Sequence, residues 1–184
     1  PRSRGLGDVY KRQEKGLAHV PEDRQRMGLI TDFKANENLI FGYHHQQPFS
    51  KSSVLMESEI LSYSRKVMND YDVRPQAPDL ITSNFSGGNQ QKIILSRELN
   101  KNPKVLLVGQ PTRGVDIGAI EFIHQRLIDM RDKGVAILLV SVELEEVLSL
   151  SDRIIVMFDG KIVGEKTNQD VTDREIGLLM AGIS

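Results

Sequence analysis

The sequence predicts an α/β domain in which helices cover a parallel sheet. Two continuous apolar runs, 104–108 and 136–140, have the length and composition of strands buried on both faces. Between them, apolar residues recur at helical spacing from Ile120 to Met130, and Gly134 follows as a helix stop. A strand, a helix and a second strand in this order form a βαβ unit, which is the building block of a parallel sheet.

The composition is that of one ordinary globular domain. The chain has 184 residues, with 24 lysines and arginines against 25 aspartates and glutamates, 39% apolar residues and no cysteine. These values argue against a disulfide scaffold and against a polybasic nucleic-acid module. No stretch reaches the roughly 18 consecutive apolar residues of a membrane span. The lack of cysteine fits a reducing compartment.

The first thirteen residues, PRSRGLGDVYKRQ, look like the translation of a transposon-end adapter used in sequencing libraries. We therefore expect 1–13 to be an adapter-derived scar, the alternative being a flexible native N-terminus. Residues 14–184 would then be part of a domain that begins abruptly. Without the scar the chain has 20 basic and 24 acidic residues, a net charge of −4, and no basic stripe for nucleic acid.

Changes in hydrophobic period predict the remaining elements. Residues 17–20 form a short apolar strand, and 48–53 form a polar loop. Apolar residues spaced by four and three predict an amphipathic helix over 54–71, whose stripe we expect in a core rather than against a cofactor. A third strand covers 154–158, and Asp159-Gly160 is the turn dipeptide of a hairpin.

The sharpest local signal is FSGGNQQK, in which Ser86, Gly87 and Gly88 open an apolar helix. A serine cap followed by two glycines presents backbone N–H groups and the positive end of the helix dipole to an anion. The missing Cβ atoms allow close approach, and the serine hydroxyl can donate another hydrogen bond. The motif predicts a phosphate cradle, although these residues alone fit a plain helix cap better.

Downstream, VLLVGQPTRGVDIGA follows directly after a predicted buried strand. In this order the two motifs resemble the ATP-binding cassette (ABC) family of P-loop NTPases, in which a signature motif precedes a Walker B strand and a D-loop. The resemblance covers 14–184 and implies a helical signature subdomain over about 30–100, with the remaining core in 14–29 and 101–184. The loop G-x-x-x-x-G-K-[ST] is absent from the sequence, which we attribute to truncation.

The truncation would make this nucleotide-binding domain incomplete, because the strand that carries the phosphate loop is missing. In similar cassettes that strand lies inside the sheet, so its loss would leave two apolar edges without a neighbour. Such edges aggregate. We therefore expect the isolated chain to be poorly soluble or partly unfolded.

The resemblance also implies roles for individual residues: ATP binding by the signature motif, alignment of the opposing site by the D-loop, and contact with a membrane subunit by a coupling loop in VPEDR. The residues concerned are, in that order, Ser86, Gly87, Gly88, Asn89 and Gln90; Asp116; and Glu22, Asp23 and Arg24. For Arg113, contact with the opposite cassette and a structural salt bridge are equally open. No side chains have metal-ligand spacing, and His44 and His45 are expected on the surface.

Three departures from the family pattern predict that this cassette does not hydrolyse ATP on its own face. Similar cassettes end the Walker B strand in Asp-Glu, which help to hold Mg²⁺ and polarise the attacking water. Those positions are Gly109 and Gln110 here, and Val142 stands where the switch histidine usually lies. A missing general base lowers a rate by about two to four orders of magnitude. We therefore expect no intact catalytic residue and an inactive isolated chain.

The signature face is instead expected to serve a neighbouring cassette in an ATPase. ATP and Mg²⁺ would bind between two cassettes, the partner being the N-terminal cassette of the same protein or a second ATPase copy. Transmembrane permease subunits, and indirectly a substrate-binding protein, are the other implied partners. This arrangement places the protein peripherally at the cytoplasmic face of the plasma (inner) membrane, with no nucleic acid.

Finer resemblance favours one transported class. ENLIFGYHHQQPFS and GQPTRGVDIGAIEFIHQRL look most like the second cassette of nucleoside or purine importers. The alternatives are a monosaccharide importer of the ribose or galactose type and a non-hydrolytic structural or regulatory cassette. A cassette acting in translation or DNA repair is disfavoured, because VPEDR resembles an importer loop.

Overall fold

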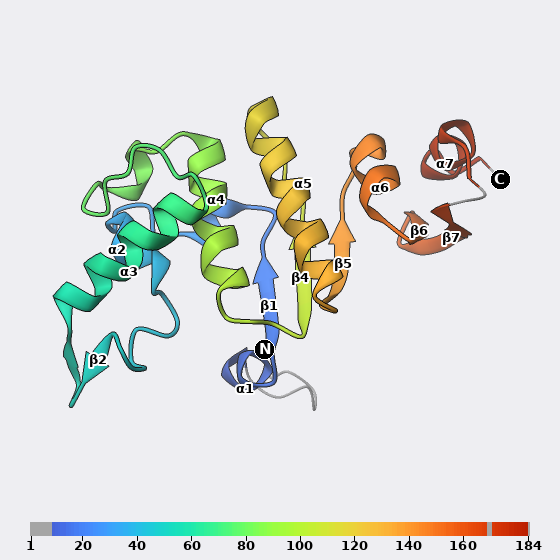
Figure 1. Ribbon diagram of the computed structural model, residues 1–184. Coiled ribbons are helices and arrows are strands. Elements are labelled where there is room, and N and C mark those ends of the chain that lie inside the picture. The colour runs from blue at the N-terminus through green and yellow to red at the C-terminus, as the bar shows by residue number, and fades with distance from the viewer. Residues whose placement is uncertain (1–8, 169–170, 184) are drawn as a thin grey trace. The chain divides into compact units, whose positions relative to one another are not determined.

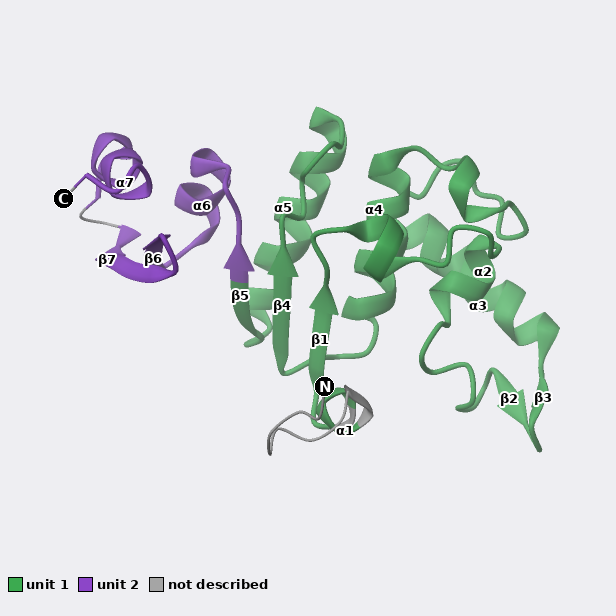
Figure 2. Ribbon diagram, turned by 180° about the vertical axis from the view of Figure 1, so that it is seen from behind, with its two compact units in different colours: residues 1–138 green, residues 139–184 purple. Residues whose placement is uncertain are grey.

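The computed structural model describes residues 9–168 and 171–183, which belong to two compact units, 1–138 and 139–184 (Figures 1 and 2). The expected adapter scar falls outside the described residues for 1–8, and Val9–Glu14 forms helix α1. The boundary expected near residue 100 differs from the division between the units, so the signature subdomain stays a prediction.

One sheet has the strand order β1-β4-β5, formed by Leu17–Val20, Val105–Gly109 and Ala136–Val140. Strands β1 and β4 belong to unit 1, which ends within β5 at Leu138. Strands β1 and β4 are parallel, with Leu17 opposite Val105. Helix α5 (Ile117–Asp132) follows β4 and stops before Gly134, whose φ of +86° suits a residue without a Cβ. The predicted strand–helix–strand order is confirmed.

The expectation that β4 and β5 are buried on both faces is wrong for β5. Leu138 is 57% exposed and Val140 is 58% exposed, and the residues between and beside them are only half-buried. In β4, Leu106 and Val108 are buried but Val105 is 40% exposed. A continuous apolar run therefore indicates a strand that can be buried on both faces. It does not show that other residues of the described chain cover both faces.

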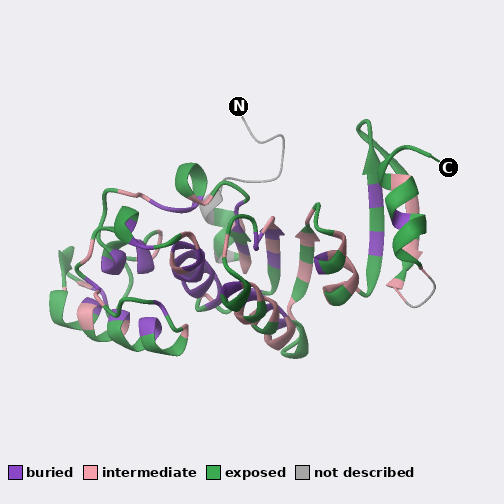
Figure 3. Ribbon diagram, turned by 90° about the horizontal axis from the view of Figure 1, so that it is seen from above, coloured by how far each residue is buried: buried purple, intermediate pink, exposed green. Residues whose placement is uncertain are grey.

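Helix α4 (Gly87–Leu99) is buried from Gln90 to Leu99 (Figure 3). It packs against β1, α5 and the short helix α2 (Ala35–Leu39). Helix α3 (Glu57–Asp70) packs against α2, and its Ile60 joins Ile40 and Phe49 in a core cluster. The apolar stripe of α3 is therefore core, as predicted.

The predicted start of this helix and the predicted loop before it are wrong. Val54–Leu55 is strand β3, which pairs antiparallel with β2 (Ser50–Lys51). Ser52 and Ser53 between them have φ of +50° and +65°. Two successive left-handed residues are typical of a type I′ hairpin turn, so the chain forms a hairpin before α3 begins.

Unit 2 contains α6 (Leu144–Leu150), a hairpin of β6 (Arg153–Phe158) and β7 (Lys161–Thr167), and α7 (Asp173–Met180). The predicted turn at Asp159-Gly160 is confirmed, since both residues have positive φ. Ile154, Val156 and Ile176 form the core of this unit. Among the residues that the structure describes, no helix has the length and apolarity needed to cross a membrane.

Candidate functional site

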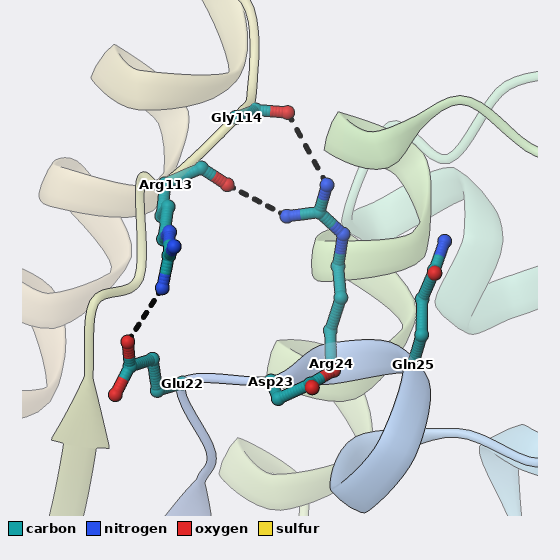
Figure 4. A pocket seen from close by; sticks show the side chains of 6 residues that line it. All are labelled: Glu22, Asp23, Arg24, Gln25, Arg113 and Gly114. Carbon is teal, nitrogen blue, oxygen red and sulfur yellow. Dashed lines mark hydrogen bonds and ion pairs between the residues drawn. The ribbon is translucent and has the colours of Figure 1, made fainter.

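Three segments that are distant in the sequence meet in unit 1: the turn after β1, the start of α4, and the loop between β4 and α5. The Arg24 guanidinium joins them, because its Nη1 donates to the Arg113 carbonyl at 2.7 Å and its Nη2 to the Gly114 carbonyl at 3.3 Å (Figure 4). A Cβ atom on Gly87 would lie 2.6 Å from the same Nη2. The expected coupling loop, signature motif and D-loop are therefore neighbours.

A second contact links the first and third of these segments. Arg113 Nη1 and Glu22 Oε1 lie 2.6 Å apart, with side chains 69% and 55% exposed. Together with Asp23, Arg24, Gln25 and Gly114 they line an open polar pocket (Figure 4). Of the two interpretations of Arg113, the structure shows the salt bridge within the chain. At this exposure the pair contributes little stability.

The two signature glycines are packed against the chain itself. A Cβ on Gly87 would lie 2.9 Å from the Gly114 carbonyl oxygen, and a Cβ on Gly88 would lie 2.9 Å from Asp116 Oδ2 and 3.0 Å from Ala119 Cβ. Real Cβ atoms almost never approach backbone oxygen so closely. The sequence predicts glycine here because a phosphate approaches closely. The contacts within the chain are a further reason why residues 87 and 88 lack a side chain.

Ser86 caps α4, as predicted. Its Oγ accepts hydrogen bonds from the Asn89 backbone N–H at 3.5 Å and from Asn89 Nδ2 at 2.8 Å. Asn89 Oδ1 accepts from the Arg74 backbone N–H at 2.7 Å, so it also ties the preceding loop to α4. Gln90 is 3% exposed and donates to the carbonyls of Thr82 and Phe85. Ser86 is exposed, whereas the Gln90 side chain supports the loop from inside.

Asp116 caps the neighbouring helix. Its Oδ1 accepts from the Ala119 backbone N–H at 2.9 Å, which satisfies one of the free N–H groups at the start of α5. Because Asp116 also lies against Gly88, the starts of α4 and α5 are close together. Their N–H groups and positive dipole ends make this region attractive to an anion.

The end of β4 carries no carboxylate. Gly109 is the last residue of the strand, and a Cβ there would lie 3.2 Å from the Glu22 backbone nitrogen. Gln110 has φ of +45°, and its carbonyl accepts from the Arg113 N–H. No group of three or more His, Cys, Asp or Glu side chains among the described residues could hold a metal ion. These residues do not fit a Mg²⁺ site.

The remaining residues singled out from the sequence are Val142, His44 and His45. Val142 belongs to unit 2 and is 64% exposed. His44 and His45 are exposed, as predicted, and lie in the loop after α2. Sequence reasoning missed the two hydrogen bonds of Arg24, since neither carbonyl acceptor leaves a signal in the sequence.

No family model matches the sequence, but known proteins are similar over almost all of it. The guanosine import ATP-binding protein NupO of Bacillus subtilis (strain 168) is 47% identical over 171 residues. The nucleoside import ATP-binding protein NupA of Lactococcus lactis subsp. cremoris (strain MG1363) is 46% identical over 169 residues. Each match covers 92% of this chain and 33% of the relative. The chain thus spans about a third of the length of these relatives.

A ribose import ATP-binding protein, RbsA of Streptococcus agalactiae serotype Ia, is 36% identical over 169 residues, which cover 92% of this chain and 34% of that protein. Among solved structures, the dimeric post-hydrolysis ATP-binding cassette MJ0796 bound to ADP and Pi superposes with a TM-score of 0.70 and 24% identity, over 89% of this chain and 68% of that one. At that identity the likeness concerns the fold.

Proposed function

We propose that this chain, which has the fold of an ATP-binding cassette and is homologous to import ATP-binding proteins, is the nucleotide-contacting part of a nucleoside importer. The observation that carries the proposal is 46–47% identity to guanosine and nucleoside import proteins over 92% of the chain. Identity to ribose and glucose import proteins is 34–37%, and identity to a putative carbohydrate transport ATP-binding protein is 40%. Monosaccharide import is the second candidate.

Within the assembled importer, we assign to the start of α4 the contact with ATP held by another cassette. Ser86 is exposed and stands before the N–H groups of the first turn of α4, beside the start of α5. These groups suit the γ-phosphate of a nucleotide bound by a partner that carries the phosphate loop. A dimeric cassette is known among proteins of the same fold, and here the partner would be the N-terminal cassette of the same protein or a second copy.

The chemistry supplied by this chain is electrostatic. Fixed N–H donors aimed at a phosphoryl group stabilise the charge that develops as the group transfers, without reorganising at the moment of reaction. Gly109 and Gln110 offer no carboxylate for Mg²⁺ or for the attacking water, so both tasks would fall to the partner cassette. This chain would therefore complete the partner's ATPase site and have none of its own.

The test is ATP hydrolysis by the full-length protein reconstituted with its permease subunits. Ser86→Arg, which fills the exposed cap, should lower turnover by about two to three orders of magnitude, the effect of losing a preorganised donor. Gln110→Ala should leave turnover nearly intact. Ser58→Arg, on the exposed first turn of α3, is the matched control. A silent Ser86→Arg would refute the contact in trans and favour a structural cassette.

The transported class has its own test. Proteoliposomes that contain the full importer should accumulate labelled guanosine, and an excess of unlabelled ribose should not compete. Uptake of ribose instead would establish the monosaccharide alternative.

A further inference from the structure

Arg24 is held in a rigid turn that directs its side chain. It is the first residue of the π-helical turn Arg24–Gly28, and Asp23 caps that turn by accepting from the Arg26 N–H at 3.0 Å. From there the guanidinium reaches two successive carbonyls, those of Arg113 and Gly114. The planar fork of arginine suits two neighbouring acceptors, whereas the single ammonium of lysine does not.

The bonds of Arg24 fasten a segment that has no regular secondary structure. The loop between β4 and α5 is shaped by short-range bonds, from the Arg113 N–H to Gln110 and from the Val115 N–H to Thr112, and Gly114 has φ of +65°. Arg24 adds a connection over 90 residues of sequence. The position of Asp116 against Gly88 therefore depends on where Arg24 holds the loop.

Stability alone does not explain this arrangement. Arg24 Nε is buried and has no hydrogen-bond partner among the described residues. A buried donor without an acceptor is unfavourable, so the guanidinium is held against Gly87 at an energetic penalty.

We propose that Arg24 is a positioning residue that locks the 113–116 loop to the start of α4. The lock itself follows from the contacts within unit 1. Only its effect on the rate of ATP turnover rests on the proposed function.

Hydrogen exchange of the full-length protein tests the lock directly. In Arg24→Gln, amides of 113–116 should exchange at least about tenfold faster, as expected when a local anchor is lost. Arg26→Gln removes the same charge from an exposed position in the same turn, and should change exchange less than about twofold. Arg24→Lys should behave like Arg24→Gln. Unchanged exchange in Arg24→Gln, or full protection in Arg24→Lys, would overturn the lock.

A second variant keeps the test open if Arg24→Gln does not fold. Gly87→Ala retains the arginine but places a methyl group 2.6 Å from Nη2, so it should also accelerate exchange in 113–116. Unchanged exchange in a folded Gly87→Ala protein would equally overturn the lock.

The effect on function is tested by ATP turnover of the reconstituted importer. The rate should fall in Arg24→Gln and stay at the wild-type value in Arg26→Gln. Faster exchange with an unchanged rate in Arg24→Gln would overturn the positioning role. A wild-type assembly without ATP turnover would instead refute the proposed function and leave the exchange result standing.

Discussion

Replacing Glu98 by glutamine should destabilise α4 by about 3 kcal/mol or more. Glu98 is 4% exposed, and its carboxylate accepts from Arg97 Nε and from Lys101 Nζ, each at 2.8 Å. Glutamine preserves the size but leaves Arg97, itself 5% exposed, without a carboxylate. Removing one partner of a buried ion pair typically costs about 3–5 kcal/mol. The lower end is expected, because Lys101 is 20% exposed and can turn toward water.

Native-state hydrogen exchange of α4 amides in the full-length protein measures this loss as a free energy of opening. Glu121→Gln, the same substitution on the exposed surface of α5, is the control and should change opening by less than about 0.5 kcal/mol. A loss below about 1 kcal/mol in Glu98→Gln, the range of exposed pairs, would refute the reasoning that this pair is desolvated.

The same carboxylate predicts a pH dependence of stability. Burial raises the pKa of Glu98, but the charges and hydrogen bonds of Arg97 and Lys101 outweigh it and hold the pKa below its usual 4.5. A carboxyl whose folded pKa is lowered stabilises the folded state above its unfolded pKa, and that contribution is lost as pH falls through the folded pKa. The difference between wild type and Glu98→Gln should be full at neutral pH and narrow below pH 4.5. A difference that stays constant into strong acid would contradict this assignment.

Four further predictions concern single positions. Gly87→Ala should slow ATP turnover of the assembly at least about tenfold, because its Cβ would meet the Gly114 carbonyl. Gly177→Ala, whose Cβ would have no atom within 4 Å, should raise the stability of α7 by up to about 1 kcal/mol, measured by thermal melting. Asp116→Ala should lower the free energy of unfolding by about 1 kcal/mol through loss of the α5 cap. Asp116→Asn should keep the cap. A difference in ATP turnover between wild type and the asparagine variant would therefore isolate the effect of the charge. In the isolated 184-residue chain, Leu138→Lys should increase the fraction left in solution after centrifugation, since Leu138 is 57% exposed on β5; equal fractions would contradict an aggregating strand.

Local pattern was sufficient to predict the regular elements wherever one signal dominated. The strand at 17–20 and the strand at 136–140 are found with the predicted bounds. Short apolar runs bounded by turn residues are typical of buried strands. The helix predicted from residue 54 begins at Glu57 instead, because Val54 and Leu55 pair with the preceding strand across a turn. Serine at both turn positions carries little of the Asn-Gly signal that would have revealed the hairpin.

The site was predictable in its parts but not in its connections. The cap at Ser86 follows from residues adjacent in sequence. That Arg24 lies against Gly87, and that Asp116 lies against Gly88, depends on contacts between segments far apart in the chain. Periodicity and composition carry no information on such pairs. The buried position of Gln90 could not be predicted from the sequence either, because its hydrogen-bond acceptors are backbone carbonyls.

The packing of the two glycines means that contact with a phosphate and the position of the Asp116 loop cannot be changed independently at residues 87 and 88. A methyl group at Gly87, beside the N–H groups that we propose contact the phosphate, would push the Arg24 guanidinium from its two carbonyls. Arg24→Gln separates the effects, because it frees the loop and leaves the N–H groups of α4 untouched. If both variants lower turnover but only Gly87→Ala weakens nucleotide binding, the start of α4 binds the phosphate and Arg24 positions the loop. If Arg24→Gln weakens nucleotide binding as strongly, the loop and the phosphate site are one unit, and the separate positioning role is lost.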